Sequence, residues 1–327
     1  MKKININSYA KINLSLDVKG LREDGYHEVE TVMQQLDLHD NVLVRWMTAE
    51  ELTEAEKALD TIQIELSTNR PYLPVDERNL AYKAAALMVQ RYGEAFLGGK
   101  IRIDIKKRIP VAAGLAGGSG NGAAVILALN ELWNLNLSLE ELCDVGKKLG
   151  SDVPFCMMGQ AKQNSCLGEK IKKDSMATSC AIGSGTGTEL CAVAPLKAYV
   201  VLSKPRERVS TAEVYKGIDQ EIENAMIGGT PLKHPDGNIM AEALKREDKE
   251  TIKENMINLL ELYTLKKYPA VIETMNEFKK CGTHFKVMMS GSGPTVFGLC
   301  KNITESKAIC EKMLSHNKES FWTRTTW

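Results

Sequence analysis

The stretch from residue 109 to residue 122 is the part of this sequence best suited to bind a phosphate group. It contains five glycines: Gly114, Gly117, Gly118, Gly120 and Gly122. Isoleucines alternate with polar residues over 101–106, which predicts a half-buried strand before it, and residues 123–133 predict a helix after it. Glycine lets the backbone approach a ligand closely, and the N–H groups at a helix start attract anions. This order predicts a phosphate-binding loop, although a turn that only packs a helix on a sheet would have the same order.

Two common nucleotide-binding motifs are absent from the sequence. No Gly-x4-Gly-Lys-Ser/Thr occurs, because Gly98-Gly99-Lys100 is followed by isoleucine. The glycine-rich stretch also does not fit Gly-x-Gly-x-x-Gly with an acidic residue about 20 positions later. The sequence therefore predicts neither a Walker loop nor a dinucleotide fold.

Two charged side chains lie at positions where they could do chemistry. Lys11 falls within an alternating strand pattern, where a lysine usually faces solvent. Asp152 follows a predicted helix and precedes Pro154, which predicts a constrained turn. Aspartates commonly cap helices or stabilise turns at such places, so a structural role is the alternative to a catalytic one.

An aromatic residue and an imidazole stand next to each other after the Asp24-Gly25 turn. Tyr26 could stack on a planar ligand and His27 could form a hydrogen bond with its edge. The alternative is a half-buried tyrosine beside a surface histidine.

Composition limits the class of protein. A chain of 327 residues with 43% hydrophobic residues is long enough for two domains and a sizeable core. Lys plus Arg and Asp plus Glu both number 42, so no global charge favours nucleic acid or an anionic membrane. The eight cysteines form no Cys-x2-Cys pair, and no apolar run approaches the ~20 residues of a membrane span. We therefore expect a cytoplasmic protein with reduced thiols and no membrane partner.

Periodicity and capping signals predict alternating strands and helices elsewhere. Strands are expected around residues 4–18, 31–36, 62–66, 199–202, 286–289 and 296–300. Helices are expected over residues 79–91, 138–149, 210–215 and 304–314, with two or three more within 238–280. Residues 46–60 predict an exposed, acidic, helical excursion. Residues 160–182 are polar, and we expect them to form a peripheral insertion.

Four separated motifs occur in an order that resembles the GHMP kinase superfamily, which includes galactokinase, homoserine kinase and mevalonate kinase. They are Ala10-Lys11-Ile12-Asn13, the 110–124 loop, Leu149-Gly150-Ser151-Asp152-Val153-Pro154-Phe155 and Ser290–Thr295. Further segments resemble the 4-diphosphocytidyl-2-C-methyl-D-erythritol kinase family within it: Asp24-Gly25-Tyr26-His27, Asp76-Glu77-Arg78-Asn79-Leu80 and Ser210-Thr211-Ala212-Glu213-Val214-Tyr215.

The resemblance implies an α+β, two-domain GHMP-kinase fold with the active site in the interdomain cleft. It implies an N-terminal ATP-binding domain over residues 1–160, an inserted or linker region over 161–195 and a C-terminal domain over 196–327. It also implies ATP and Mg²⁺ as cofactors, although it does not indicate which residues bind the metal. The implied oligomeric state is a monomer or a homodimer. The residues implied to bind ATP are Pro110, Val111, Ala112, Ala113, Gly114, Leu115, Ala116, Gly117, Gly118, Ser119, Gly120 and Asn121.

The implied reaction is phosphoryl transfer from ATP to the 2-hydroxyl of 4-diphosphocytidyl-2-C-methyl-D-erythritol, in non-mevalonate isoprenoid precursor biosynthesis. Asp152 would accept or orient the proton of that hydroxyl, and Lys11 would pair with it. A turn would close the phosphate side through Ser290, Gly291, Ser292 and Gly293. The residues implied to bind the substrate are Asn13, Tyr26, His27, Thr211 and Tyr215, with the two tyrosines sandwiching the cytosine.

The sequence departs from the family pattern at a few positions. Gly120 stands where a second serine is usual, and Gly122 stands for the first of two alanines. Ser8-Tyr9 replaces the usual Ala-Pro, and Met33 replaces a common aromatic. If backbone N–H groups hold the phosphates, the missing hydroxyl at position 120 should matter little. The closest approach is then expected at Gly118, with positive φ.

Two other functions stay open. Another small-molecule kinase of the superfamily, acting on mevalonate or homoserine, would not need the aromatic residues Tyr26, His27 and Tyr215. A catalytically silent relative that binds nucleotide or RNA would not need Lys11 and Asp152, and the zero net charge disfavours RNA.

Overall fold

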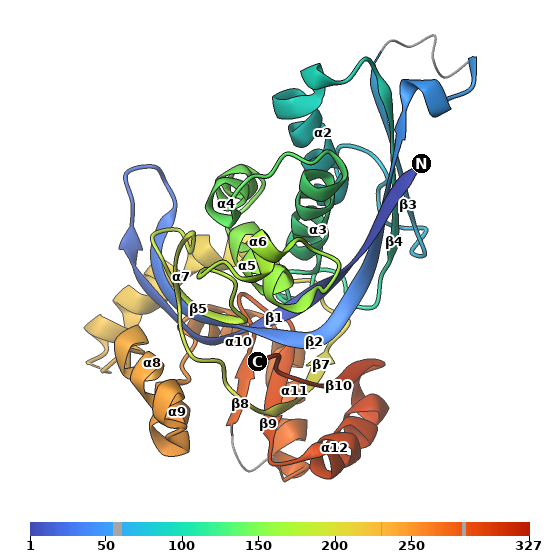
Figure 1. The fold of residues 1–327 in the computed structure, drawn as a ribbon. Coiled ribbons are helices and arrows are strands. Elements are labelled where there is room, and N and C mark those ends of the chain that lie inside the picture. The colour runs from blue at the N-terminus through green and yellow to red at the C-terminus, as the bar shows by residue number, and fades with distance from the viewer. Residues whose placement is uncertain (55–60, 230, 283–285) are drawn as a thin grey trace. The chain divides into compact units, whose positions relative to one another are not determined.

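The structure is a computed structural model (Figure 1). Its chain forms two compact units, and two long strands, β1 (Lys2–Leu21) and β2 (His27–Thr48), each contribute residues to both of them. It describes residues 1–54, 61–229, 231–282 and 286–327. The first unit consists of Met1–Ala10, Leu38–Ile109 and Ala116–Ser179, and the second of Lys11–Asp37, Pro110–Leu115 and Cys180–Trp327. Both units therefore combine segments far apart in the sequence. The domain boundaries at residues 160 and 195 stay predictions.

The first unit contains a sheet, and the sequence predicted which side chains of one strand are buried. β4 (Gly99–Lys106) pairs antiparallel with residues 41–48 of β2 and parallel with β3 (Ile62–Thr68). Ile101, Ile103 and Ile105 are all buried, while the residues between them are more exposed. The alternating pattern predicted over 101–106 is therefore confirmed.

Five α-helices in the described ranges belong to the same unit. They are α2 (Leu80–Tyr92), α3 (Gly117–Leu132), α4 (Leu139–Lys147), α5 (Asp152–Gln163) and α6 (Glu169–Lys172). The predicted capping residues begin two of them. The Asn79 side chain accepts a hydrogen bond from the Ala81 N–H at the start of α2, and Ser138 with Glu141 forms a capping box at the start of α4.

Two helix starts differ from the sequence predictions. α3 begins at Gly117 rather than at residue 123, so much of the glycine-rich stretch is helical. Glycine is unfavourable inside a helix, but here neighbouring backbone lies where side chains would project: a Cβ on Gly122 would be 3.3 Å from the Leu80 carbonyl oxygen. Asp152 is the first residue of α5 rather than part of a turn, and Pro154 is accommodated because it falls in the first helical turn.

The second unit contains two sets of paired strands. β5 (Cys180–Ser184) pairs with residues 31–34 of β2 and with β6 (Glu189–Ala192). A four-stranded sheet has the order β10-β7-β9-β8. These strands are β7 (Tyr199–Lys204), β8 (Lys286–Met289), β9 (Val296–Cys300) and β10 (Glu319–Arg324). The strands predicted over 199–202, 286–289 and 296–300 are therefore confirmed.

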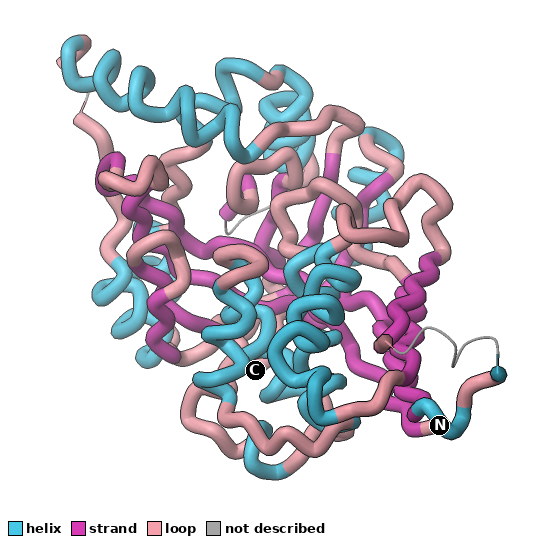
Figure 2. The backbone as a smooth tube through the Cα atoms, turned by 90° about the horizontal axis from the view of Figure 1, so that it is seen from above, coloured by secondary structure: helices cyan, strands magenta, loops and turns pink. Residues whose placement is uncertain are grey.

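Six α-helices lie in the part of the second unit that the structure describes. They are α7 (Thr211–Ile227), α8 (Gly237–Arg246), α9 (Lys249–Asn255), α10 (Glu261–Lys267), α11 (Pro269–Lys280) and α12 (Ile303–His316). Residues 238–280 thus contain four helices rather than two or three, because Pro269 begins α11 instead of interrupting a longer helix. Figure 2 shows helices in cyan and strands in magenta. Helices together with a sheet that has both parallel and antiparallel pairs agree with the α+β class.

The prediction of an exposed excursion over residues 46–60 was partly wrong. β2 continues to Thr48, and the side chains of Trp46 and Leu52 are buried. Trp46 packs edge-on against Phe96 and Trp133, a cluster from three segments that no local pattern indicates. Residues 55–60 lie outside the described part of the chain.

The prediction that residues 160–182 form a peripheral insertion was wrong. Leu167 and Ile171 are buried, and residues 180–182 belong to β5. The segment is also hydrogen-bonded to β1: Asn164 accepts from the Asn7 N–H at 2.8 Å and donates to the Asn7 carbonyl oxygen at 3.1 Å. The apolar residues here are too few to produce a periodic stripe, yet these two are buried.

No helix in the described ranges is long and apolar enough to cross a membrane.

We expect Leu167→Ala to lower the free energy of unfolding by about 2–4 kcal/mol, because it leaves a cavity where a buried side chain was. The exposed Lys162→Ala in the same segment serves as control and should stay within about 0.5 kcal/mol of wild type. Urea unfolding followed by circular dichroism measures both. Equal stability of the two variants would show that the segment is peripheral after all.

Candidate active site

The loop segment 110–115 lies directly against the Ser290–Gly293 turn in the second unit. Gly114 has a φ of +70°, and a Cβ placed on it would come too close to the Ser290 carbonyl oxygen. The Ser290 hydroxyl donates a hydrogen bond to the Gly114 carbonyl oxygen at 3.0 Å. The two glycine-rich motifs, separate in the sequence, are therefore brought into contact, and only glycine fits at position 114.

Side chains of the α10 region hold the Ser290–Gly293 turn from behind. The Asn258 amide donates to the Met289 carbonyl oxygen at 2.9 Å and to the Gly291 carbonyl oxygen at 2.8 Å. Glu261 accepts a hydrogen bond from the Met289 N–H at 2.7 Å. Gly291 and Gly293 have φ values of +57° and +89°, the left-handed conformation that such a tight turn requires.

Lys11 heads a buried chain of hydrogen bonds next to the same turn. Its Nζ donates to Asn13 Oδ1 at 2.9 Å, and Asn13 Nδ2 donates to the Thr31 hydroxyl at 2.8 Å. The Thr31 hydroxyl donates in turn to the Ser15 carbonyl oxygen at 2.7 Å. Lys11 is only 4% exposed, so the alternative of a solvent-facing strand lysine is wrong. Its ammonium group is fixed rather than mobile.

This chain of hydrogen bonds reaches both glycine segments. The Lys11 N–H donates to the Leu115 carbonyl oxygen at 3.2 Å. A Cβ on Gly291 would be 3.4 Å from Asn13 Oδ1 and 3.6 Å from the Gly114 carbonyl oxygen. The structure thus gathers Lys11, Asn13, the loop segment 110–115 and the Ser290–Gly293 turn at one place in the second unit.

The structure places two of the predicted substrate-binding residues, Thr211 and Tyr215, on α7, where Thr211 contacts the Ser290–Gly293 turn and Tyr215 contacts His27. The Thr211 and Ser292 hydroxyls are 2.8 Å apart, which joins the start of α7 to the turn. Tyr215 lies one helical turn further along α7, and its ring centroid is 5.3 Å from that of His27. His27 Nε2 is 3.0 Å from an Asp219 carboxylate oxygen. Tyr26, in contrast, is 66% exposed.

The remainder of the predicted phosphate-binding loop begins α3 in the first unit. Ala116 has a left-handed φ of 53° directly before α3, so the chain turns sharply there. The first N–H groups of α3, like those of any helix, have no intrahelical partner. Gly118 is exposed, whereas Gly120 and Asn121 are buried. The first turn of α3 is therefore accessible at its start and packed behind.

The expectation of a positive φ at Gly118 was wrong. Gly118 lies within α3 and has no positive φ, so no backbone strain demands glycine there. At Gly120, by contrast, a Cβ would be 2.7 Å from the Ser8 hydroxyl oxygen. Position 120, where we expected the missing hydroxyl to matter little, is thus the more crowded of the two.

A buried polar cluster, Ser8, Asp40, Lys107 and Asn121, supports this part of the loop. Asp40 forms an ion pair with Lys107 and accepts hydrogen bonds from the N–H groups of residues 108 and 109 at 2.6 and 2.9 Å. Asn121 accepts from Lys107 Nζ at 3.0 Å and donates to Asp40 at 3.0 Å. The Asn121 side chain therefore points into the protein.

Asp152 begins α5 in the first unit, after Gly150 at a φ of +155°. Its carboxylate lies in the first helical turn, where the helix dipole favours negative charge. Its catalytic role stays a prediction.

Several supporting residues lie outside the motifs of the sequence. Thr31, Asp40, Lys107, Asn258 and Glu261 all contact the glycine segments or their neighbours, although none lies in a glycine motif. The signal that could have found two of them is polarity inside apolar strands. Asp40 and Lys107 both stand at positions where the alternating pattern of a half-buried strand would place an apolar residue. A charge at such a position is normally paired.

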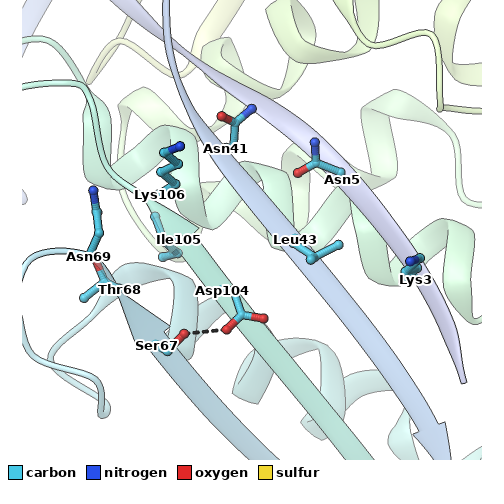
Figure 3. Close-up of a pocket in the computed structure, with 10 residues that line it drawn as sticks. All are labelled: Lys3, Asn5, Asn41, Leu43, Ser67, Thr68, Asn69, Asp104, Ile105 and Lys106. Atoms are coloured by element: carbon cyan, nitrogen blue, oxygen red, sulfur yellow. Dashed lines mark hydrogen bonds between the residues drawn. The ribbon is translucent and has the colours of Figure 1, made fainter.

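A groove of about 840 Å³ in the first unit lies apart from these residues (Figure 3). It is lined by side chains of β1, β2, β3 and β4, including Lys3, Asn41 and Asp104. Asp104 is already engaged by Arg45 and Ser67. The groove contains none of the predicted site residues, so we do not assign it to catalysis.

Among the described residues, no group of three or more His, Cys, Asp or Glu side chains could hold a metal ion. A protein cage for a cation is therefore not found in those ranges.

Glu261 makes the support of the turn sensitive to pH. Burial raises the pKa of its carboxyl from 4.5 to about 7, although the Met289 N–H and nearby Lys286 oppose the shift. Its stabilising contribution is complete below about pH 4.5 and is lost as the pH rises through 7. Between pH 5 and 8, the free energy of unfolding of wild type should fall by up to about 3 kcal/mol relative to that of Glu261→Gln. The glutamine keeps an acceptor for the Met289 N–H but does not ionise.

The measurement is the free energy of unfolding at several pH values, with the exposed Glu273→Gln as control. Glu273→Gln should follow wild type throughout. Parallel pH profiles for wild type and Glu261→Gln would contradict this account of the turn.

Two family models match this chain. GHMP kinases N terminal domain matches residues 79–160, which include α3 and Asp152, and GHMP kinases C terminal matches residues 240–319, which include the Ser290–Gly293 turn. The predicted GHMP-kinase fold is therefore confirmed.

Full-length relatives narrow the family. A 4-diphosphocytidyl-2-C-methyl-D-erythritol kinase of Acetivibrio thermocellus is 39% identical over 326 residues, which is 99% of this chain and 100% of the relative. One of Bacillus pumilus is 42% identical over 290 residues, 89% of this chain and 86% of the relative.

Solved structures agree with this result. The crystal structure of a 4-(cytidine 5'-diphospho)-2C-methyl-D-erythritol kinase matches with a TM-score of 0.73 at 27% identity, over 99% of this chain and 100% of the other. A mevalonate kinase of L. major shares the fold, with a TM-score of 0.67 at 15% identity over 99% of this chain and 96% of the other. This chain belongs to the 4-diphosphocytidyl-2-C-methyl-D-erythritol kinase family of the GHMP kinases.

Proposed function

We propose that this chain transfers the γ-phosphoryl group of ATP to the 2-hydroxyl of 4-diphosphocytidyl-2-C-methyl-D-erythritol. One observation carries the proposal in a member of this family: Lys11, Asn13, the loop segment 110–115 and the Ser290–Gly293 turn converge at one place. Phosphoryl transfer depends chiefly on positioning and on neutralising charge, and a fixed ammonium group beside two glycine segments provides both.

The backbone of both glycine segments is proposed to hold the ATP phosphates. Gly114, Gly291 and Gly293 adopt left-handed conformations, and successive N–H groups in such conformations form concave anion sites. In the first unit, the start of α3 is proposed to hold phosphate as well, because the first N–H groups of a helix have no intrahelical partner. The bulk of the triphosphate charge would thus be met by N–H dipoles together with Lys11.

Asp152 is proposed to orient the attacking hydroxyl and to receive its proton. The substrate oxygen forms a bond to the γ-phosphorus while the bond to the β–γ bridging oxygen breaks, so ADP leaves with that electron pair. The negative charge of Asp152 is favoured at the start of α5. A carboxylate at this place is suited to accept the proton as the new bond forms.

The residues present fit a Mg²⁺ ion bound mainly through ATP. Mg²⁺ in kinases is held by phosphate oxygens, water and one or two side-chain oxygens rather than by a protein cage. The first turn of α3 offers the Ser119 hydroxyl, and the start of α5 offers the Asp152 carboxylate. When bound, the ion would neutralise charge on the β- and γ-phosphates.

His27, Tyr215 and Asp219 are proposed to recognise the cytosine of the substrate. If His27 Nε2 carries the proton and donates it to Asp219, then Nδ1 is an acceptor for the amino group of cytosine. The Tyr215 ring beside His27 offers a stacking surface, and the exposed Tyr26 could cover the opposite face of the base. A small aliphatic alcohol would use none of these groups.

An ADP-release assay with three alcohols tests the substrate. We expect kcat/KM for the cytidyl substrate to exceed that for mevalonate and homoserine by about 10³-fold or more, because the polar groups of the base pocket would otherwise lack partners. Tyr215→Ala should raise KM for the cytidyl substrate roughly 5- to 150-fold and leave KM for ATP unchanged. Tyr215→Phe keeps the ring and serves as control. If mevalonate or homoserine were phosphorylated with the same kcat/KM as the cytidyl substrate, the proposal would be wrong.

Asp152→Asn should lower kcat by about 10²-fold or more without unfolding the protein, because the amide cannot accept the proton. Lys11→Met should lower kcat similarly, since it removes a fixed positive charge. The exposed Asp144→Asn in α4 is the matched control and should keep full activity. Near wild-type turnover by Asp152→Asn would end its assignment as the catalytic carboxylate.

A further inference from the structure

The hydroxyl of Ser8 occupies the space into which a side chain at position 120 would project. A Cβ built on Gly120 would be 2.7 Å from Ser8 Oγ, 3.3 Å from the Tyr9 carbonyl oxygen and 3.6 Å from Gln160 Nε2. The Ser8 side chain is completely buried, so it cannot turn out into solvent. Serine at position 8 and glycine at position 120 therefore depend on each other.

Ser8 also binds the residue that follows Gly120. Its Oγ accepts a hydrogen bond from Asn121 Nδ2 at 3.1 Å. Asn121 is in contact with Asp40 and Lys107, and Asp40 accepts the N–H groups of residues 108 and 109. Through this cluster, β1 is linked to the backbone that enters the phosphate-binding loop and to the helix that leaves it.

The cluster is strongly constrained by its burial. Asp40 is fully buried, and Lys107 and Asn121 are 5% and 3% exposed. A buried charge that loses a partner is costly, so the four side chains have little freedom to rearrange. A displacement at Ser8 or at position 120 is therefore transmitted to the first turn of α3.

We propose that Ser8 is a positioning residue of the phosphate-binding loop. Its hydroxyl, delivered from β1, takes the place of the serine that is usual at position 120 in the family, and Gly120 leaves the room for it. The inference rests on the proposed function, because it assumes that the loop binds the phosphates of ATP. N–H groups stabilise phosphate only at hydrogen-bond distance, so a small shift of the start of α3 weakens ATP binding.

A cycle of four proteins tests the pair: wild type, Ser8→Ala, Gly120→Ser and the double variant. Gly120→Ser alone should lower the Tm by roughly 3 °C or more and raise the Kd for ATP about tenfold or more, because the new Cβ displaces Ser8 and the helix start. In the double variant the hydroxyl introduced at position 120 can replace that of Ser8. We expect its Tm to return to the wild-type value and its Kd for ATP to return to within about threefold of wild type.

A fifth variant separates the steric effect from the hydrogen bond. Ser8→Ala combined with Gly120→Ala removes the collision but supplies no hydroxyl to Asn121. Its Tm should recover more than its affinity for ATP, whereas the double variant with serine at position 120 recovers both. Calorimetry with ATP and thermal unfolding provide the two readouts.

The outcomes distinguish this inference from the proposed function. If wild type binds ATP and the double variant is no better than Gly120→Ser, the inference about Ser8 is wrong while the proposed function stands. Wild-type stability and affinity in Gly120→Ser alone would also overturn it. If wild type binds no ATP, the proposed function fails, and the positioning role of Ser8 fails with it.

Discussion

The buried carboxylate of Asp40 is the group on which the phosphate-binding loop most depends. It neutralises Lys107, accepts two backbone N–H groups just before the loop and contacts Asn121 just after the start of α3. Burying such a charge is expensive unless every lone pair is used, and here the partners converge on it from two segments. That convergence fixes the loop backbone from the inside and leaves the outer N–H groups for a ligand.

The same solution recurs in the second unit with different residues. Asn258 and Glu261 bind the backbone of the Ser290–Gly293 turn and its preceding residue from behind, as Asp40 does at residues 108 and 109. Both glycine-rich segments are thus rigid despite their composition. Glycine at Gly114 and Gly293 is required by positive φ and close approach rather than by flexibility. A preorganised backbone of this kind loses little conformational entropy when a phosphate binds.

The sequence allowed prediction wherever the determining residues are local. The period of Ile101, Ile103 and Ile105 predicted β4, and Ser138 with Glu141 predicted the start of α4. It did not allow prediction where the determining contact is distant. Gly120 is obligatory because of Ser8, more than a hundred positions earlier, and the helix start at Gly117 depends on packing that no propensity contains.

The candidate site shows the same division. The motifs indicated the resemblance, and the structure brings Lys11, Asn13 and the two glycine segments together as the resemblance implies. The Tyr215 ring, however, lies beside His27, whose Nε2 is close to Asp219, so residues of α7 and the start of β2 meet within the second unit. The departures at positions 8 and 120 looked independent in the sequence and prove to be neighbours in space.

Amide hydrogen exchange with and without a non-hydrolysable ATP analogue tests most directly whether backbone N–H groups of both glycine segments hold the phosphates. We expect a saturating analogue to slow exchange at residues 111–119 and at residues 291 and 292, and we expect this protection to be lost when adenosine replaces the analogue. Unchanged exchange at both segments, with protection confined to other parts of the chain, would contradict it.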